Sequence, residues 1–158
     1  MPNVECEINL ATFRAIAKKY PNKDAAGILR DLVKSEPGAE GKWFAAAKDA
    51  GLFDVAIELA RRSPTDPRTL TRAARDFAIK RPEFALAAGL TALAWMARGH
   101  GFDLTGLDVL AAFDVVMQVA LGAGLDEPQI KAQVRQMIEV QPAVLNFVQK
   151  ILQVQLSQ

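Results

Sequence analysis

Apolar residues recur along most of the chain with the spacing of an α-helix. In the segment 68–78, for example, Leu70, Ala73, Ala74, Phe77 and Ala78 follow an i, i+3, i+4, i+7, i+8 pattern that places them on one helical face. The alternation of apolar and polar residues that is typical of a half-buried strand is absent. The pattern predicts an all-α protein in which Phe77 is a core residue.

Prolines mark many of the predicted helix ends. An apolar residue is followed by one polar, often basic turn and then by a proline, which cannot continue the helix. The cations in these turns also suit the negative end of the helix dipole. The pairs are Ala17 and Pro21, Val33 and Pro37, Ala60 and Pro64, Ala78 and Pro82, and Ile138 and Pro142.

Capping residues indicate where helices begin. Asp66 precedes Pro67, whose missing N–H is not needed at a helix start. The spacing of a capping box occurs in Thr105 with Asp108 and in Asp126 with Gln129. Starts and stops together predict about nine helices, at residues 10–19, 23–35, 40–50, 52–62, 67–80, 83–98, 105–122, 127–140 and 143–156.

The connectors between these helices are short, so neighbours in sequence are expected to pack as consecutive antiparallel hairpins. No long polar linker divides the chain, which predicts a single helical domain over residues 1–158 with an irregular segment at 1–8. The segments 105–122 and 143–156 are more apolar than a regular solenoid requires. We therefore expect a solenoid-like N-terminal two-thirds followed by a more compact C-terminal bundle.

Two segments also echo each other. AKKYPNKDAAGIL (17–29) and AIKRPEFALAAGL (78–90) each combine a helix end, a proline and an Ala-Ala-Gly patch where two helices could approach closely. The alternative is chance similarity, because alanine is abundant in this chain.

A resemblance to known architectures rests on paired helices with alanines at packing positions and proline at the turns. The residues concerned are Ala46, Ala47, Gly51 and Ala56 in one helical pair, and Ala73, Ala74, Phe77, Pro82 and Ala85 in the next. On these residues, the region 10–99 resembles helical-hairpin repeats of the tetratricopeptide or coat-protein solenoid kind. The tetratricopeptide period of about 34 residues and its W-x2-L-G-x2-Y signature are missing, so the resemblance concerns architecture and not a named family. It implies a scaffold that binds proteins.

Composition narrows the class of protein. The net charge of +1 over 158 residues argues against a chain that holds nucleic acid with its whole surface. Cys6 is the only cysteine and cannot form an internal disulfide. The N-terminus lacks the pattern of a secretory signal, and the longest apolar run, 84–97, is shorter than the roughly 20 residues of a membrane span. A cytoplasmic protein that does not enter a membrane is expected.

Residues suited to catalysis or metal binding are sparse. Cys6 and His100 are the only thiol and imidazole, too few for a zinc site, and His100 is expected in solvent or at a helix cap. No nucleophile motif or phosphate-binding loop is present, so we predict no catalytic residue, no metal and no cofactor. Carboxylates such as Asp108 and Asp114 remain the route to catalysis, although they lie about 240° apart on a helix. These residues favour a protein that is not an enzyme, while a carboxylate-dependent enzyme stays an alternative.

The strongest candidate for contact is the segment 60–82, which has seven cationic and two acidic side chains, a local charge of +5. On a helical wheel, Arg68, Arg72 and Arg75 lie opposite the apolar face, at about 140–200° from Leu70. Like charges at this spacing repel each other, so folding alone gains little from them. A solvated helix face, with neutralisation by Glu58 or Glu83, is the ordinary interpretation.

The functional interpretation is a non-catalytic interaction or scaffold module that binds a protein partner, possibly an acidic one. Its candidate binding residues are Arg68, Arg72, Arg75, Arg61 and Arg62. One alternative is weak binding of a phosphate-bearing ligand or nucleic acid by the face formed by Arg68, Arg72 and Arg75. The other alternative is a carboxylate-dependent enzyme.

Overall fold

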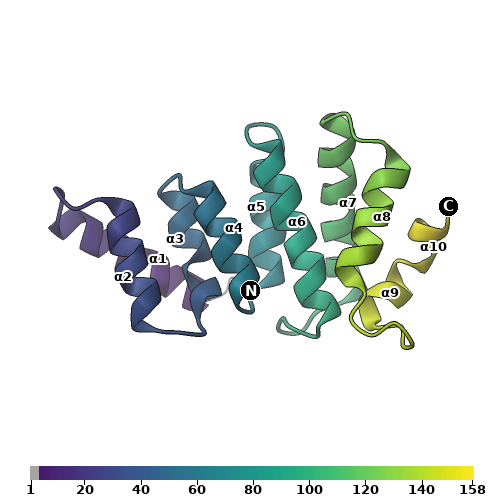
Figure 1. Ribbon diagram of the computed structural model, residues 1–158, viewed down its shortest axis with the longest axis horizontal. Helices are drawn as coiled ribbons and strands as arrows, with labels where there is room; N and C mark the ends of the chain where they lie inside the picture. Colours follow the sequence, from purple (N-terminus) through teal and green to yellow (C-terminus); the bar gives the residue numbers. More distant parts are fainter. Residues whose placement is uncertain (1–3) are drawn as a thin grey trace. The chain divides into compact units, whose positions relative to one another are not determined.

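The computed structural model describes the backbone of residues 4–158 and the side chains from Asn9 onward. Within these residues the protein is all-helical, as the sequence predicts, and its only β-type pairing is an isolated bridge between Gln141 and Val144. The helices, labelled in Figure 1, are α1 (Val4–Lys19), α2 (Ala25–Ser35), α3 (Phe44–Asp49), α4 (Phe53–Arg62), α5 (Pro67–Asp76), α6 (Pro82–Ala97), α7 (Gly106–Gly122), α8 (Glu127–Ile138), α9 (Phe147–Ile151) and α10 (Gln153–Ser157), with a 3-10 segment η1 (Glu40–Trp43). None of the described helices is long and apolar enough to cross a bilayer.

The predicted helix boundaries need correction at both ends of the chain. Helix α1 begins at Val4, so residues 4–8 are helical and not irregular as predicted, whereas residues 1–3 lie outside the described part. The helix predicted at 143–156 is replaced by the short helices α9 and α10, because Asn146 caps a helix that starts after it and accepts a hydrogen bond from the Gln149 N–H.

Helix α5 ends at Asp76, four residues before the predicted end. Phe77 then occupies the C-cap, where its N–H donates to the Ala73 carbonyl. It is half-buried and meets the Phe84 ring edge to face at 5.4 Å between ring centroids. The prediction that Phe77 is a core residue is therefore wrong as stated, because the helix that would have carried it into the core stops one turn early.

The described helices group into two compact units, one ending at Thr65 and the other beginning at Asp66. Because each unit is described by itself, the single domain, the solenoid-like arrangement and the helical repeat stay predictions. In the N-terminal unit, α2 packs mainly on α1, α3 and η1, and α4 packs on α3 and η1. Its core includes the fully buried side chains of Leu29, Phe44, Ala46 and Ala56, and Trp43 is buried beside them as predicted.

A glycine holds η1 against the end of α4. The Gly41 N–H donates to Ser63 Oγ at 2.7 Å, and the Thr65 hydroxyl donates to the carbonyls of Ala60 and Ser63. A Cβ at position 41 would lie 2.1 Å from Thr65 Oγ1 and 2.8 Å from the Pro64 carbonyl oxygen. Only glycine allows this close approach without movement of the backbone.

The C-terminal unit is built around α6, which contacts α5, α7, α8 and α9. Figure 1 shows α5 and α7 beside α6. Nearly every residue of α6 from Ala88 to Ala97 is buried, including Trp95, as the apolar run predicts. Gly89 lets α6 approach α7, because a Cβ there would lie 2.6 Å from Val116 Cγ2. The matching Gly27 in α2 has no neighbour closer than 4.0 Å, so only one of the two Ala-Ala-Gly patches lies at a tight helix contact.

Candidate interaction site on helices α5 and α7

The start of α5 determines where its arginines point. The Asp66 carboxylate accepts hydrogen bonds from the Thr69 N–H at 3.1 Å and from the Thr69 hydroxyl at 2.8 Å, and Pro67 occupies the first turn. This cap was predicted from the sequence and is confirmed. Because Leu70 and the buried alanines of α5 face the core, Arg72 and Arg75 are exposed on the other side of the helix.

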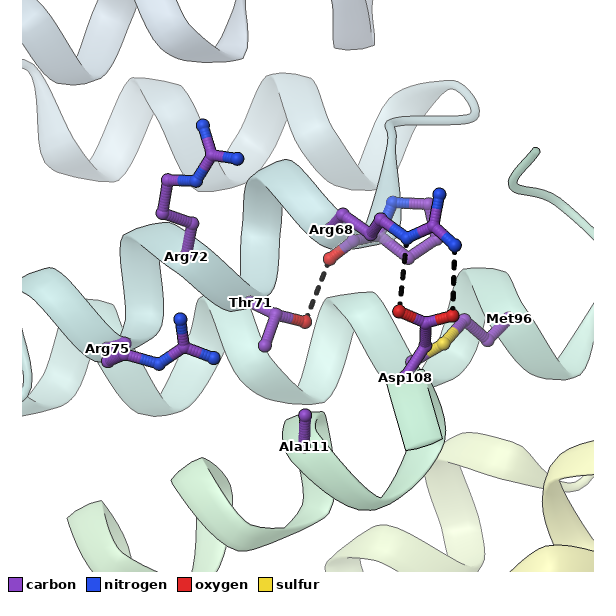
Figure 2. Close-up of a pocket in the computed structure, with 8 residues that line it drawn as sticks. Arg68, Thr71, Arg72, Arg75, Met96, Asp108 and Ala111 are labelled. Carbon is purple, nitrogen blue, oxygen red and sulfur yellow. Dashed lines mark hydrogen bonds and ion pairs between the residues drawn. The ribbon is translucent and has the colours of Figure 1, made fainter. Parts of the chain in front are cut away.

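Arg68, the first of the three arginines, is bound to Asp108 of α7. Its Nε donates to Asp108 Oδ1 at 3.0 Å and its Nη2 donates to Oδ2 at 3.1 Å, a bidentate pair (Figure 2). The same guanidinium donates to the backbone carbonyls of Phe102 at 3.1 Å and of Asp103 at 2.9 Å. Arg68 thus fastens the α6–α7 loop and the start of α7 to α5, and it is largely occupied by structural contacts.

Asp108 has a second role as part of a helix cap. Its Oδ2 accepts a hydrogen bond from the Thr105 N–H at 2.8 Å, which completes the predicted capping box. The pKa of Asp108 falls from its ordinary value to about 2, chiefly because Arg68 hydrogen-bonds to the carboxylate, with a further contribution from Thr105. Both carboxylate oxygens are occupied, so Asp108 is a poor candidate for a general acid or base near neutral pH.

Arg72 and Arg75 differ from Arg68 in having no acidic partner among the described residues. Both line a hollow of about 190 Å³ between α5 and α7, together with Thr71, Met96 and Ala111. In Figure 2, the Arg75 side chain extends in the direction of Thr71, whereas Arg72 extends away from Ala111. The Thr71 hydroxyl donates to the Pro67 carbonyl at 2.8 Å, which leaves the guanidinium groups as the principal free polar groups of the hollow.

The other two candidate arginines lie elsewhere. Arg61 and Arg62 end α4 in the N-terminal unit, where both are exposed and Arg62 Nη2 lies 3.6 Å from Glu40 Oε1. The structure therefore divides the five predicted residues between the two units. Of the two acids expected to neutralise the stripe, Glu83 forms no ion pair with it among the described residues, and Glu58 belongs to α4 of the other unit.

The acid that pairs with Arg68 was missed by sequence reasoning. Asp108 is 40 residues away along the chain, and its identification as a capping residue concealed its second contact. No local signal connects the two positions, because the contact depends on how α7 packs beside α5.

The remaining candidates for chemistry do not form a cluster. Asp114 is exposed on α7, and His100 is exposed with its ring against the edge of Trp95 at 5.2 Å between centroids. Gly99 and Gly101 have positive φ angles of 84° and 125° and form the turn expected after α6. The side chain of Cys6 lies outside the described residues. Among the residues that are described, no three histidine, cysteine, aspartate or glutamate side chains are placed to hold a metal ion.

Comparisons with protein-family models, with curated proteins and with solved structures found no match.

Proposed function

We propose that the protein is a non-catalytic interaction module and that the α5–α7 face of its C-terminal unit binds an acidic segment of a partner protein. The observation that carries this proposal is the pair of exposed guanidinium groups of Arg72 and Arg75, which border a hollow and have no acidic partner among the described residues. Arg68, one turn before Arg72, is already neutralised by Asp108. Among the residues that line the hollow, the charges of Arg72 and Arg75 are therefore left for an anionic ligand to neutralise.

Guanidinium groups favour this chemistry because each presents a planar fork of N–H donors that matches a carboxylate. The Arg68–Asp108 pair and the Asp66 cap also hold α5 in place. Binding therefore does not have to order the backbone, which lowers its entropic cost. None of the residues that line the hollow is aromatic, so the hollow itself offers no ring on which a base could stack; the exposed Phe102 lies in the adjoining α6–α7 loop.

The test is a titration of the protein with a fluorescein-labelled oligo-glutamate peptide at low ionic strength. We expect binding that weakens with added salt, and a loss of about tenfold in affinity in the double variant Arg72→Gln/Arg75→Gln, because two exposed charge contacts are removed. Glutamine keeps helix propensity, so the fold is retained. A matched control is Lys80→Gln/Lys150→Gln, which removes two exposed cations of the same unit that do not line the hollow.

Equal affinity of the native protein and the Arg72/Arg75 variant would contradict the proposal. Oligothymidylate of the same charge serves as a second probe. If it binds more tightly than the peptide, with a slope of log K against log salt of about −0.7 for each phosphate contact, the ligand class is nucleic acid and not protein.

A further inference from the structure

The N-terminal unit has a hollow between α2 and α4. It has a volume of about 510 Å³, within the range of roughly 300–1,000 Å³ that is usual for binding sites. The two helices pack mainly on other elements of the unit, and η1, which both contact, contributes Glu40 to the lining of the hollow. The groove is thus formed by the fold of the unit.

The walls of this groove are apolar rows with helical spacing. Leu29 and Val33 lie one turn apart on α2, and Val55 and Leu59 lie one turn apart on α4. Leu29 and Leu59 are almost completely buried, while the two valines are partly exposed to the groove. Two such rows form a channel into which the i, i+3, i+4 row of a third helix can pack.

The charges on the rim are distributed unevenly. Arg30 and Lys34 lie one turn apart on the α2 side, exposed and without an acidic partner among the described residues. Other lysines of this region are paired: Lys23 with Asp31 at 3.0 Å, and Lys42 with Glu36.

The α4 side of the rim differs. It presents Glu58, exposed, and Arg62, whose guanidinium is 3.6 Å from Glu40 Oε1. The groove therefore has a positive α2 wall facing a wall of mixed charge.

We infer that the α2–α4 groove is a docking site for an amphipathic helix of a partner protein that buries apolar residues between the two walls and places acidic residues, one turn apart, against Arg30 and Lys34. The helical spacing of Arg30 and Lys34 matches glutamates at i and i+4 of such a helix. This surface belongs to a different unit from the α5–α7 face, so it is a second site, independent of the one proposed above.

The experiment measures binding of a fluorescein-labelled amphipathic peptide by fluorescence anisotropy. The peptide has about 15 residues, or four helical turns, with leucines at i, i+3, i+4 and i+7 and glutamates one turn apart along one flank. A second peptide carries lysines in place of the glutamates. We expect the acidic peptide to bind the native protein at least tenfold more tightly than the basic one.

Charge reversal then tests the assigned wall. In the variant Arg30→Glu/Lys34→Glu we expect the acidic peptide to lose tenfold or more in affinity and the basic peptide to gain affinity, which restores binding with the signs exchanged. The matched control is Lys18→Glu/Lys19→Glu, which reverses two exposed cations of the same unit outside the groove and should leave the affinity of both peptides unchanged. Circular dichroism of each variant verifies that the helices are retained.

Three results would overturn the inference. The first is equal binding of the two peptides to the native protein, or an equal loss in the control variant. The second is binding of dodecanoate that depends on Arg30 and Lys34 when neither peptide binds, which would assign the groove to a small amphiphilic carboxylate. The third is a dimer in sedimentation velocity that dissociates in the Arg30→Glu/Lys34→Glu variant, which would identify a second copy of the chain as the occupant.

Loss of oligo-glutamate binding in Arg72→Gln/Arg75→Gln leaves this inference untouched, because those residues lie in the other unit.

Discussion

The Asp108 carboxylate stabilises two contacts at once, the ion pair to Arg68 and the cap of α7. Its low pKa has a direct consequence for stability. Because the folded-state pKa lies below the ordinary value of 3.8, Asp108 stabilises the fold at pH values above about 4, and this contribution is lost as the pH falls toward 2. The Asp108 carboxyl forms its ion pair with Arg68 only when it is ionised.

Replacement of Asp108 by asparagine should therefore destabilise the protein near neutral pH, by about 1–2 kcal/mol, because the Arg68 guanidinium loses its charged acceptor. The measurement is urea denaturation at several pH values. The difference between the native protein and the variant should shrink as the pH approaches 2. Asp114→Asn, an exposed position on the same helix, should change stability by less than about 0.5 kcal/mol. A difference for Asp108→Asn that does not depend on pH would contradict the assigned role.

Phe77 and Phe44 offer a graded test of burial. Phe44 has no exposed surface, so Phe44→Ala should cost about 3–5 kcal/mol. Phe77 is half-buried and contacts Phe84 edge to face, so Phe77→Ala should cost about 1.5–3 kcal/mol. Arg72→Ala should cost less than about 1 kcal/mol because the side chain is exposed. Chemical denaturation gives the order, and a Phe77 variant as destabilised as the Phe44 variant would show that Phe77 is more deeply packed than its exposure indicates.

Close approach of backbone segments decides how the elements of the N-terminal unit join. Gly41→Ala places a methyl group against Thr65 Oγ1 and the Pro64 carbonyl, so η1 or the end of α4 must shift. We expect a loss of about 1–3 kcal/mol in thermal or urea unfolding. In Gly27→Ala, in α2 of the same unit, the added methyl group has no neighbour closer than 4.0 Å, so the change should be neutral or stabilising by up to about 1 kcal/mol. If both substitutions change the stability by the same amount, the contact between η1 and the end of α4 does not require a glycine at position 41.

The contact between α6 and α7 allows a compensating test. Gly89→Ala should destabilise by about 1–3 kcal/mol, because its methyl group meets Val116 Cγ2. Val116→Ala alone leaves a cavity and is also destabilising. The double variant should be more stable than the sum of the two effects predicts, since each change makes room for the other. Additive effects in a double-mutant cycle would exclude a direct contact between these two positions.

Over the whole molecule, the protection of backbone amides from exchange is expected to be unequal, because α6 packs more extensively against other helices than any other element of its unit. Amide hydrogen exchange should be slowest in the central part of α6, where Ala88–Ala97 are buried, and faster in the short helices α9 and α10, where every residue except Val148 and Leu156 is exposed or half-buried. Mass spectrometry of the exchanged protein measures this order. Faster exchange in α6 than in α9 would show that the C-terminal unit is not organised around α6.

The sequence by itself determined the helical class and most helix boundaries, because helical periodicity, proline stops and capping residues act within a few neighbouring residues. It correctly predicted the Asp66 cap, the capping box at Thr105 and the burial of Trp43 and Trp95. The same kind of signal gave one wrong helix end. The apolar spacing of α5 continues past Phe77, although the helix ends at Asp76.

Only the tertiary structure decided which arginines are available. Arg68, Arg72 and Arg75 are equivalent on a helical wheel, but α7 brings Asp108 to Arg68 alone and leaves the other two without an acid. The groove between α2 and α4 likewise joins residues of α2 and η1 to residues of α4, which α3 separates from them along the chain. Ion pairs and grooves of this kind depend on distances between helices, which the periodicity of each helix does not encode.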